Sequence, residues 1–84
     1  MTNTTYKDFP FTANGVNFVS RVYSHSPFLS QIERLPEGVF ASMNIQAVTE
    51  IIGDASLLTH DELLSELDVV NAGGSHAFIL LGDN

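Results

Sequence analysis

The three histidines, His25, His60 and His76, are the first places to look for catalysis or metal binding in this chain. A zinc site needs three or four ligands that converge on one point, and no histidine lies at i,i+4 from another or in a useful pattern with carboxylates. Nucleophilic catalysis needs a hydroxyl group facing a base, whereas neighbours in sequence such as Ser75 and His76 point apart. The sequence therefore predicts no enzyme activity, no metal site and no cofactor.

Carboxylates and glycines gather nearer the C-terminus. Glu62 and Glu66 lie one helical turn apart, which is a spacing that an acid–base pair would use. That role requires a buried or strongly perturbed environment, and a solvated helix face is the more ordinary setting for the spacing. Gly73-Gly74 is not followed by Lys-Ser or Lys-Thr and does not open a helix, so it does not match a phosphate-binding loop.

Charge is the most informative bulk property. The formal net charge is −7. After Arg34 the chain has eight Asp and Glu residues and no Lys or Arg. Nucleic acids and anionic membranes both attract clustered cations, so we expect no direct binding to either. A basic protein surface would be attracted to this region. The alternative is an acidic surface that only keeps a small protein soluble.

Length and composition indicate one domain over residues 1–84. A chain of this size buries roughly 60% of its unfolded surface, which leaves little room for a deep pocket. The chain has no cysteine, which excludes disulfides and cysteine-bound zinc. The first residues lack the features of a signal peptide, and no apolar run reaches the length of a membrane span. We therefore expect a soluble, cytoplasmic protein, and its oligomeric state stays open.

The N-terminal part predicts a β-hairpin with strands at about 6–13 and 16–24. Asn14-Gly15 suits both positive-φ positions of a type I′ turn and places Ala13 opposite Val16. Alternation then puts most apolar side chains on one face. Pro10 cannot donate to a sheet, so the first strand should lie at an edge.

Two helices are expected after the hairpin. Ser26 and Pro27 suit the start of a helix over about 27–35. Asn44 is expected to cap a second helix over about 45–52. Its apolar stripe would consist of Ile45, Val48, Ile51 and Ile52.

A third helix, over about 60–70, has the strongest local signals. Thr59 and Glu62 form the pattern of a capping box, and Gly73-Gly74 follows the helix. Residues 76–81 are a possible final strand. The chain thus predicts an α+β fold in which two or three short helices pack on the apolar face of the hairpin.

Residues 58–74 combine an acidic helix with Gly73-Gly74, and they resemble the end of a double-glycine leader. Such leaders belong to precursors of ribosomally made, modified peptides and bacteriocins. In that family a maturation enzyme or exporter peptidase recognises the helix, and cleavage follows the second glycine. The resemblance implies a leader of residues 1–74 and a core peptide of residues 75–84. The alternative is a helix ended by glycines and followed by a buried strand.

Two functional hypotheses follow. The first is a small acidic protein-binding module, and one form of it is a phage- or mobile-element-encoded inhibitor that occupies a basic site on a host protein. Its partner-binding residues would be the polar side chains of the third helix: Asp61, Glu62, Ser65, Glu66 and Asp68. The alternative is the peptide precursor, with cleavage at Gly73 and Gly74.

Overall fold

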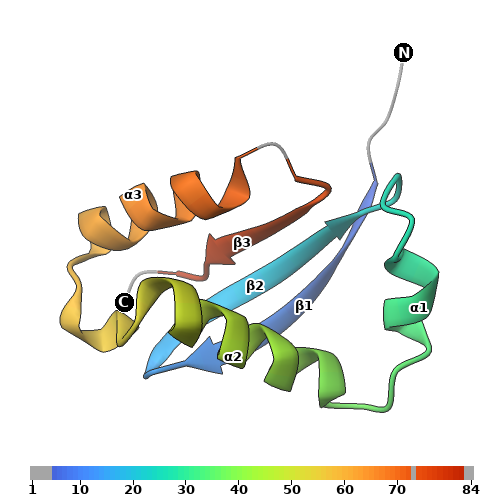
Figure 1. Ribbon diagram of the computed structural model, residues 1–84, viewed down its shortest axis with the longest axis horizontal. Helices are drawn as coiled ribbons and strands as arrows, with labels where there is room; N and C mark the ends of the chain where they lie inside the picture. Colours follow the sequence, from blue (N-terminus) through green and yellow to red (C-terminus); the bar gives the residue numbers. More distant parts are fainter. Residues whose placement is uncertain (1–4, 73, 83–84) are drawn as a thin grey trace.

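The computed structural model describes residues 5–72 and 74–82. Its centre is a three-stranded antiparallel sheet in the order β1-β2-β3. Along the chain the elements are β1 (Tyr6–Ala13), β2 (Val16–Tyr23), α1 (Leu29–Glu33), α2 (Val39–Ile52), the 3₁₀ turn η1 (Ala55–Leu57), α3 (His60–Asn71) and β3 (His76–Leu80). Helix α2 runs along β1 and α3 along β3 (Figure 1). This arrangement confirms the predicted α+β fold and its final strand, which pairs with β2 of the hairpin.

The hairpin forms in the predicted register. Asn14 and Gly15 both have positive φ angles, 52° and 79°, as a type I′ turn requires. Ala13 pairs with Val16. The Ser24 N–H donates to the Thr5 carbonyl (2.8 Å), and alternation along an antiparallel pair then turns the backbone of Pro10 away from β2. Pro10 therefore lies on the outer edge, where its missing N–H removes no sheet hydrogen bond.

The core fills the space between the sheet and the two long helices. Phe11 stacks on Phe18 (5.4 Å between ring centroids) and meets Phe78 edge to face (5.9 Å). Val48 from α2 and two leucines of α3, Leu63 and Leu67, complete this cluster. Burying such a side chain contributes about 1.5–3 kcal/mol, so β3 belongs to the folded core through Phe78.

Helix α2 differs from its prediction. It begins at Val39, six positions before the expected residue 45, because Gly38 turns the chain with a φ of 87°. Asn44 is consequently not a cap: it is buried inside the helix and donates its Nδ2–H to the Phe40 carbonyl (2.8 Å). That hydrogen bond offsets the cost of burying the amide. The predicted stripe was also partly wrong, because Ile45 and Ile51 are exposed whereas Val48 is buried.

Helix α3 follows its local signals, whereas the predicted cap of α1 at Ser26 was wrong, because Phe28 precedes this helix and no side chain caps it. Helix α1 covers Leu29–Glu33, which is shorter than the expected 27–35; Ser26 Oγ accepts a hydrogen bond from the Phe28 N–H (3.3 Å) in the turn before it. Helix α3 has the predicted capping box at its start and ends one residue later than expected. Over the described part of the chain, no helix has the length and apolar character needed to cross a membrane.

Candidate functional site

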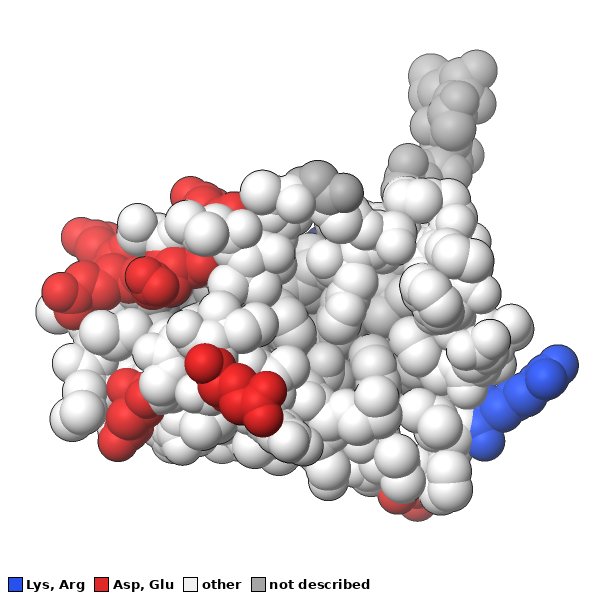
Figure 2. Space-filling view, viewed as in Figure 1, with Lys and Arg blue, Asp and Glu red and all other residues white. Residues whose placement is uncertain are grey.

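The five predicted partner-binding residues are all exposed on α3. Asp61, Ser65 and Asp68 recur every three or four residues, so they share one face of the helix, opposite the buried leucines. Glu62 and Glu66 lie on the flank facing the end of α2, where they line a shallow hollow with Ile52. Acidic side chains gather at this end of the molecule, whereas the visible blue side chain lies at the opposite end, near α1 (Figure 2).

Glu62 has a structural role as well. Its Oε1 accepts a hydrogen bond from the Thr59 N–H (2.9 Å), and Thr59 Oγ1 accepts one from the Glu62 N–H (3.2 Å). This reciprocal pair satisfies two backbone donors that the first turn of a helix leaves free. A partner would therefore compete with the helix cap for this carboxylate, and Asp61, Glu66 and Asp68 are the freer acceptors.

The cations of the chain lie in its N-terminal part. Within residues 5–72 and 74–82 there are two ion pairs, Lys7–Glu33 (2.7 Å) and Arg21–Asp8 (2.8 Å). The hydrogen bonds from Arg21 lower the pKa of Asp8. Neither pair includes a residue after Arg34, so the carboxylates of α3 are not neutralised by a Lys or Arg in the described structure.

Large apolar side chains are exposed on α3 and just before it in the chain. Val69 is 75% exposed on α3, and Leu57, in the 3₁₀ turn before the helix, is 79% exposed. The sequence did not single them out, because an apolar residue next to a helical stripe gives no sign of which side it will face. Only the orientation of α3 on the sheet shows that they lie outside the core.

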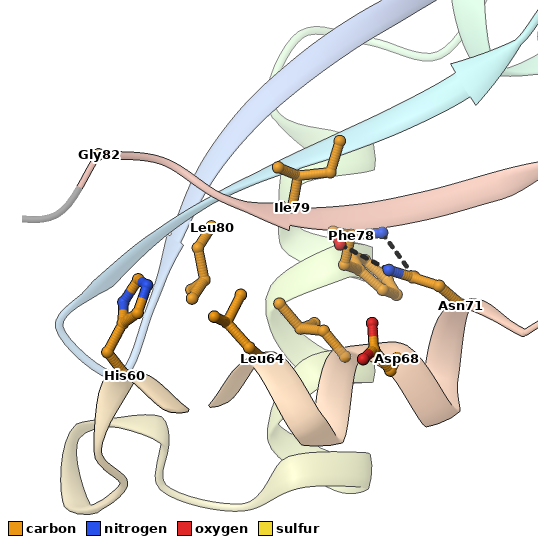
Figure 3. A pocket seen from close by; sticks show the side chains of 9 residues that line it. His60, Leu64, Asp68, Asn71, Phe78, Ile79, Leu80 and Gly82 are labelled. Atoms are coloured by element: carbon orange, nitrogen blue, oxygen red, sulfur yellow. Dashed lines mark hydrogen bonds between the residues drawn. The ribbon is translucent and has the colours of Figure 1, made fainter. Parts of the chain in front are cut away.

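A groove of about 570 Å³ runs between α3 and β3 (Figure 3). Leu64 and Asp68 line it from the helix, and Leu80 from the strand. At one end the Asn71 carboxamide spans both elements: its Nδ2–H donates to the Phe78 carbonyl and its Oδ1 accepts from the Phe78 N–H, both at 2.8 Å. The side chain thus bonds to β3 as a neighbouring strand would, and it fixes the end of α3 to the sheet.

One contact between a serine and a histidine was not predicted from the sequence. Ser20 Oγ is hydrogen-bonded to His76 Nε2 across β2 and β3, under the helices. Burial lowers the pKa of His76, and its ring lies between Phe40 and Phe78. Ser20 is completely buried, so no substrate reaches its hydroxyl group. This pair therefore satisfies two polar groups in the core and does not form an accessible nucleophile.

The remaining chemical candidates stay apart. Nowhere in the described ranges do three His, Asp or Glu side chains lie close enough together to hold a metal ion. Of the two glycines at the expected cleavage position, Gly73 lies outside the described residues. Gly74 is exposed, and its N–H donates a long hydrogen bond to the Asn71 carbonyl (3.4 Å).

Comparisons with protein-family models, with curated proteins and with solved structures found no match to this chain.

Proposed function

We propose that this protein is a small acidic protein-binding module whose α3 face meets a basic surface on another protein. One observation carries the proposal: the carboxylates of Asp61, Glu66 and Asp68 are exposed on one helix and pair with no Lys or Arg in the described structure. Complementary charge speeds the encounter with such a partner and selects against acidic ones.

Val69 and Leu57 supply the apolar part of this surface. Charged side chains at the rim of an interface mainly set its association rate, whereas most of the binding energy comes from a few well-buried side chains. Two aliphatic side chains that are about three-quarters exposed, one on α3 and one in the turn before it, are suited to that role. We propose that the partner covers them while its Lys or Arg side chains meet the carboxylates.

The form of binding that we propose is inhibition. A compact acidic domain seated on a basic site of a host protein would keep other anions away from that site. A phage or mobile element would gain from encoding such an inhibitor. Cys-free composition and small size are compatible with folding in a host cytoplasm.

The test uses a double charge reversal, Asp61→Lys with Asp68→Lys. The partner is captured from host extract with the wild-type protein, identified, purified, and titrated over a series of salt concentrations. We expect the variant to bind at least about tenfold more weakly and to show a flatter salt dependence. Glu37→Lys with Glu50→Lys changes the net charge equally away from α3 and serves as the control.

The outcome that contradicts this proposal is equal affinity and equal salt dependence for the α3 variant and the wild type. Equal losses in the α3 variant and the control would show attraction by net charge alone. Circular dichroism of both variants shows whether the helices are retained, so that a loss of binding is not confused with unfolding.

The peptide precursor, with leader 1–74 and core 75–84, remains a prediction. Its core would include β3, whose Phe78 packs against Phe11. Maturation would therefore require the strand to leave the sheet. Hydrogen exchange at Ala77 and Ile79 tests this: exchange much faster than that of β2 favours a releasable core, and exchange at the rate of β2 counts against it.

A further inference from the structure

No helix in the described residues covers the sheet face opposite α2 and α3 (Figure 1), and this face carries apolar side chains beside a few polar ones. We define the open face by the alternate positions that point away from the core: Tyr6, Asp8, Pro10, Thr12, Asn17, Val19, Arg21, Tyr23, Ala77 and Ile79. An antiparallel sheet with one solvated face normally alternates apolar and polar residues. Residues 77–81 are instead apolar throughout, which is typical of a strand buried on both faces.

The polar groups of the open face already satisfy one another. Arg21 binds Asp8 through two hydrogen bonds (2.8 and 3.1 Å), and its guanidinium also lies over the Tyr6 ring, 3.8 Å from the centroid. Thr12 donates its hydroxyl proton to Asn17 Oδ1 (2.8 Å). Covering this face would therefore strand no single charge, because its only acid and its only base are already paired.

Charge decides which occupant fits. The open face has no net charge, so it offers nothing to the basic partner that suits α3. A second copy of this chain presents the same surface without net charge, and packing the two open faces together turns both acidic helical layers outward. Stacked sheets lie about 10 Å apart, and each helical layer adds about as much again. The acidic layers would then be separated by more than the Debye length of about 8 Å.

We propose that two copies of this chain form a homodimer by packing their open faces. Pro10, Val19 and Ile79 are aligned across the three strands by the sheet register, and Val19 is only 6% exposed, so Pro10 and Ile79 on either side of it supply most of the accessible surface in this row. A two-fold axis perpendicular to the strands at this row places each of these side chains against its own symmetry mate. It also sets Arg21 over Asn17 of the other copy. An axis parallel to the strands would instead stack Arg21 on Arg21, which charge repulsion disfavours.

The available area sets the expected affinity. Two strands of eight residues and one of five make a face of about 340 Å² per copy before side-chain relief is counted. Two such faces together offer about 700 Å², which lies below the standard size of a stable interface and in the range of weak, transient ones. We therefore expect a weak dimer, with a dissociation constant in the micromolar range or above.

Sedimentation equilibrium tests the proposal directly from about 5 µM to 1 mM. The monomer mass is 9.1 kDa, and we expect the weight-average mass to rise towards twice that value across the range. Ile79→Lys places a charge on the two-fold axis, and it should weaken association at least about tenfold. Val69→Lys makes a comparable change on α3, away from the open face, and should leave association unchanged.

A second measurement covers the case in which Ile79→Lys disturbs the sheet. Because the chain has no cysteine, Ile79→Cys introduces a single thiol. A bifunctional maleimide about as long as the spacing between packed sheets should link Ile79→Cys chains into dimers, and should link Val69→Cys chains much less. A wild-type mass that stays at 9.1 kDa up to 1 mM overturns the proposal, as does a dimer that Val69→Lys weakens and Ile79→Lys does not. Neither result tests the proposed binding of another protein at α3, because that binding is measured in a separate experiment.

Discussion

Asn71→Ala is the substitution that best tests how β3 is held in the fold. The Asn71 side chain makes two hydrogen bonds to one residue of the strand, at the edge that no other strand of the described residues covers. Asn71 and Phe78 are half-buried and buried respectively, so water replaces these bonds incompletely. Removing the carboxamide leaves both backbone groups of Phe78 without their protein partner.

The expected loss can be worked out from these contacts. A typical intramolecular hydrogen bond contributes about 1 kcal/mol net, and a backbone group left unsatisfied costs about 1–3 kcal/mol. We expect Asn71→Ala to lower the free energy of unfolding by about 2–3 kcal/mol. At about 4–8 °C per kcal/mol for a domain of this size, Tm should fall by roughly 8–24 °C.

The assay is urea and thermal unfolding followed by circular dichroism, together with hydrogen exchange at the Phe78 amide. Gln46→Ala is the control, because it removes a carboxamide that bonds only to exposed Glu50 on the surface of α2. We expect a loss below about 0.5 kcal/mol for the control. Asn71→Asp keeps an acceptor for the Phe78 N–H but aims a charged oxygen at its carbonyl, so it should not restore stability.

The reasoning is refuted if Asn71→Ala and Gln46→Ala lower stability equally. It is also refuted if Asn71→Ala is destabilising while protection at the Phe78 amide is unchanged. Either result would show that β2 and the core hold β3 without the side chain of α3.

Two further predictions concern the histidine in the core and the start of α3. Burial lowers the pKa of His76 below its ordinary 6.5. As pH falls through 6.5, the His76 imidazole therefore becomes protonated in the unfolded chain while it stays neutral in the folded one. The free energy of unfolding should therefore fall from pH 6.5 downwards and level off below the pKa of the folded state. Urea titrations at several pH values measure this slope, which His76→Gln should remove. An unchanged slope in His76→Gln contradicts the assignment. Thr59→Ala removes one half of the capping box and should cost about 1 kcal/mol in the same urea assay, with Thr12→Ala on the exposed sheet as the control.

Turns and helix starts that depend on a few neighbouring residues could be predicted from the sequence. Asn14-Gly15 specified a turn because few other residue pairs tolerate positive φ at both positions. Thr59 and Glu62 specified the start of α3 because each satisfies a backbone N–H of the other. Helix α2 shows the limit of such signals. Its start depended on Gly38, and Asn44 fits a cap and a buried helical position equally well until its neighbours are known.

The candidate site was predicted in part for the same reason. Exposure of the α3 carboxylates followed from helical spacing, because their face lies opposite the buried leucines. The exposure of Leu57 and Val69 did not follow, because it depends on how α3 lies on the sheet. The open face was predicted only in part: the helices were expected on the apolar side of the hairpin, but the pairing that adds Ala77 and Ile79 to the opposite side was not.

By itself, the sequence determined the hairpin, the capped helix and a charge asymmetry, because each rests on residue types and short spacings. Tertiary structure alone decided that β3 pairs with β2, that Ser20 meets His76 across 56 positions, and that Asn71 bonds to Phe78. Each of these contacts joins groups whose meeting depends on how whole elements pack together. Local propensity carries no information on that packing, whereas burial of the shared apolar core determines it.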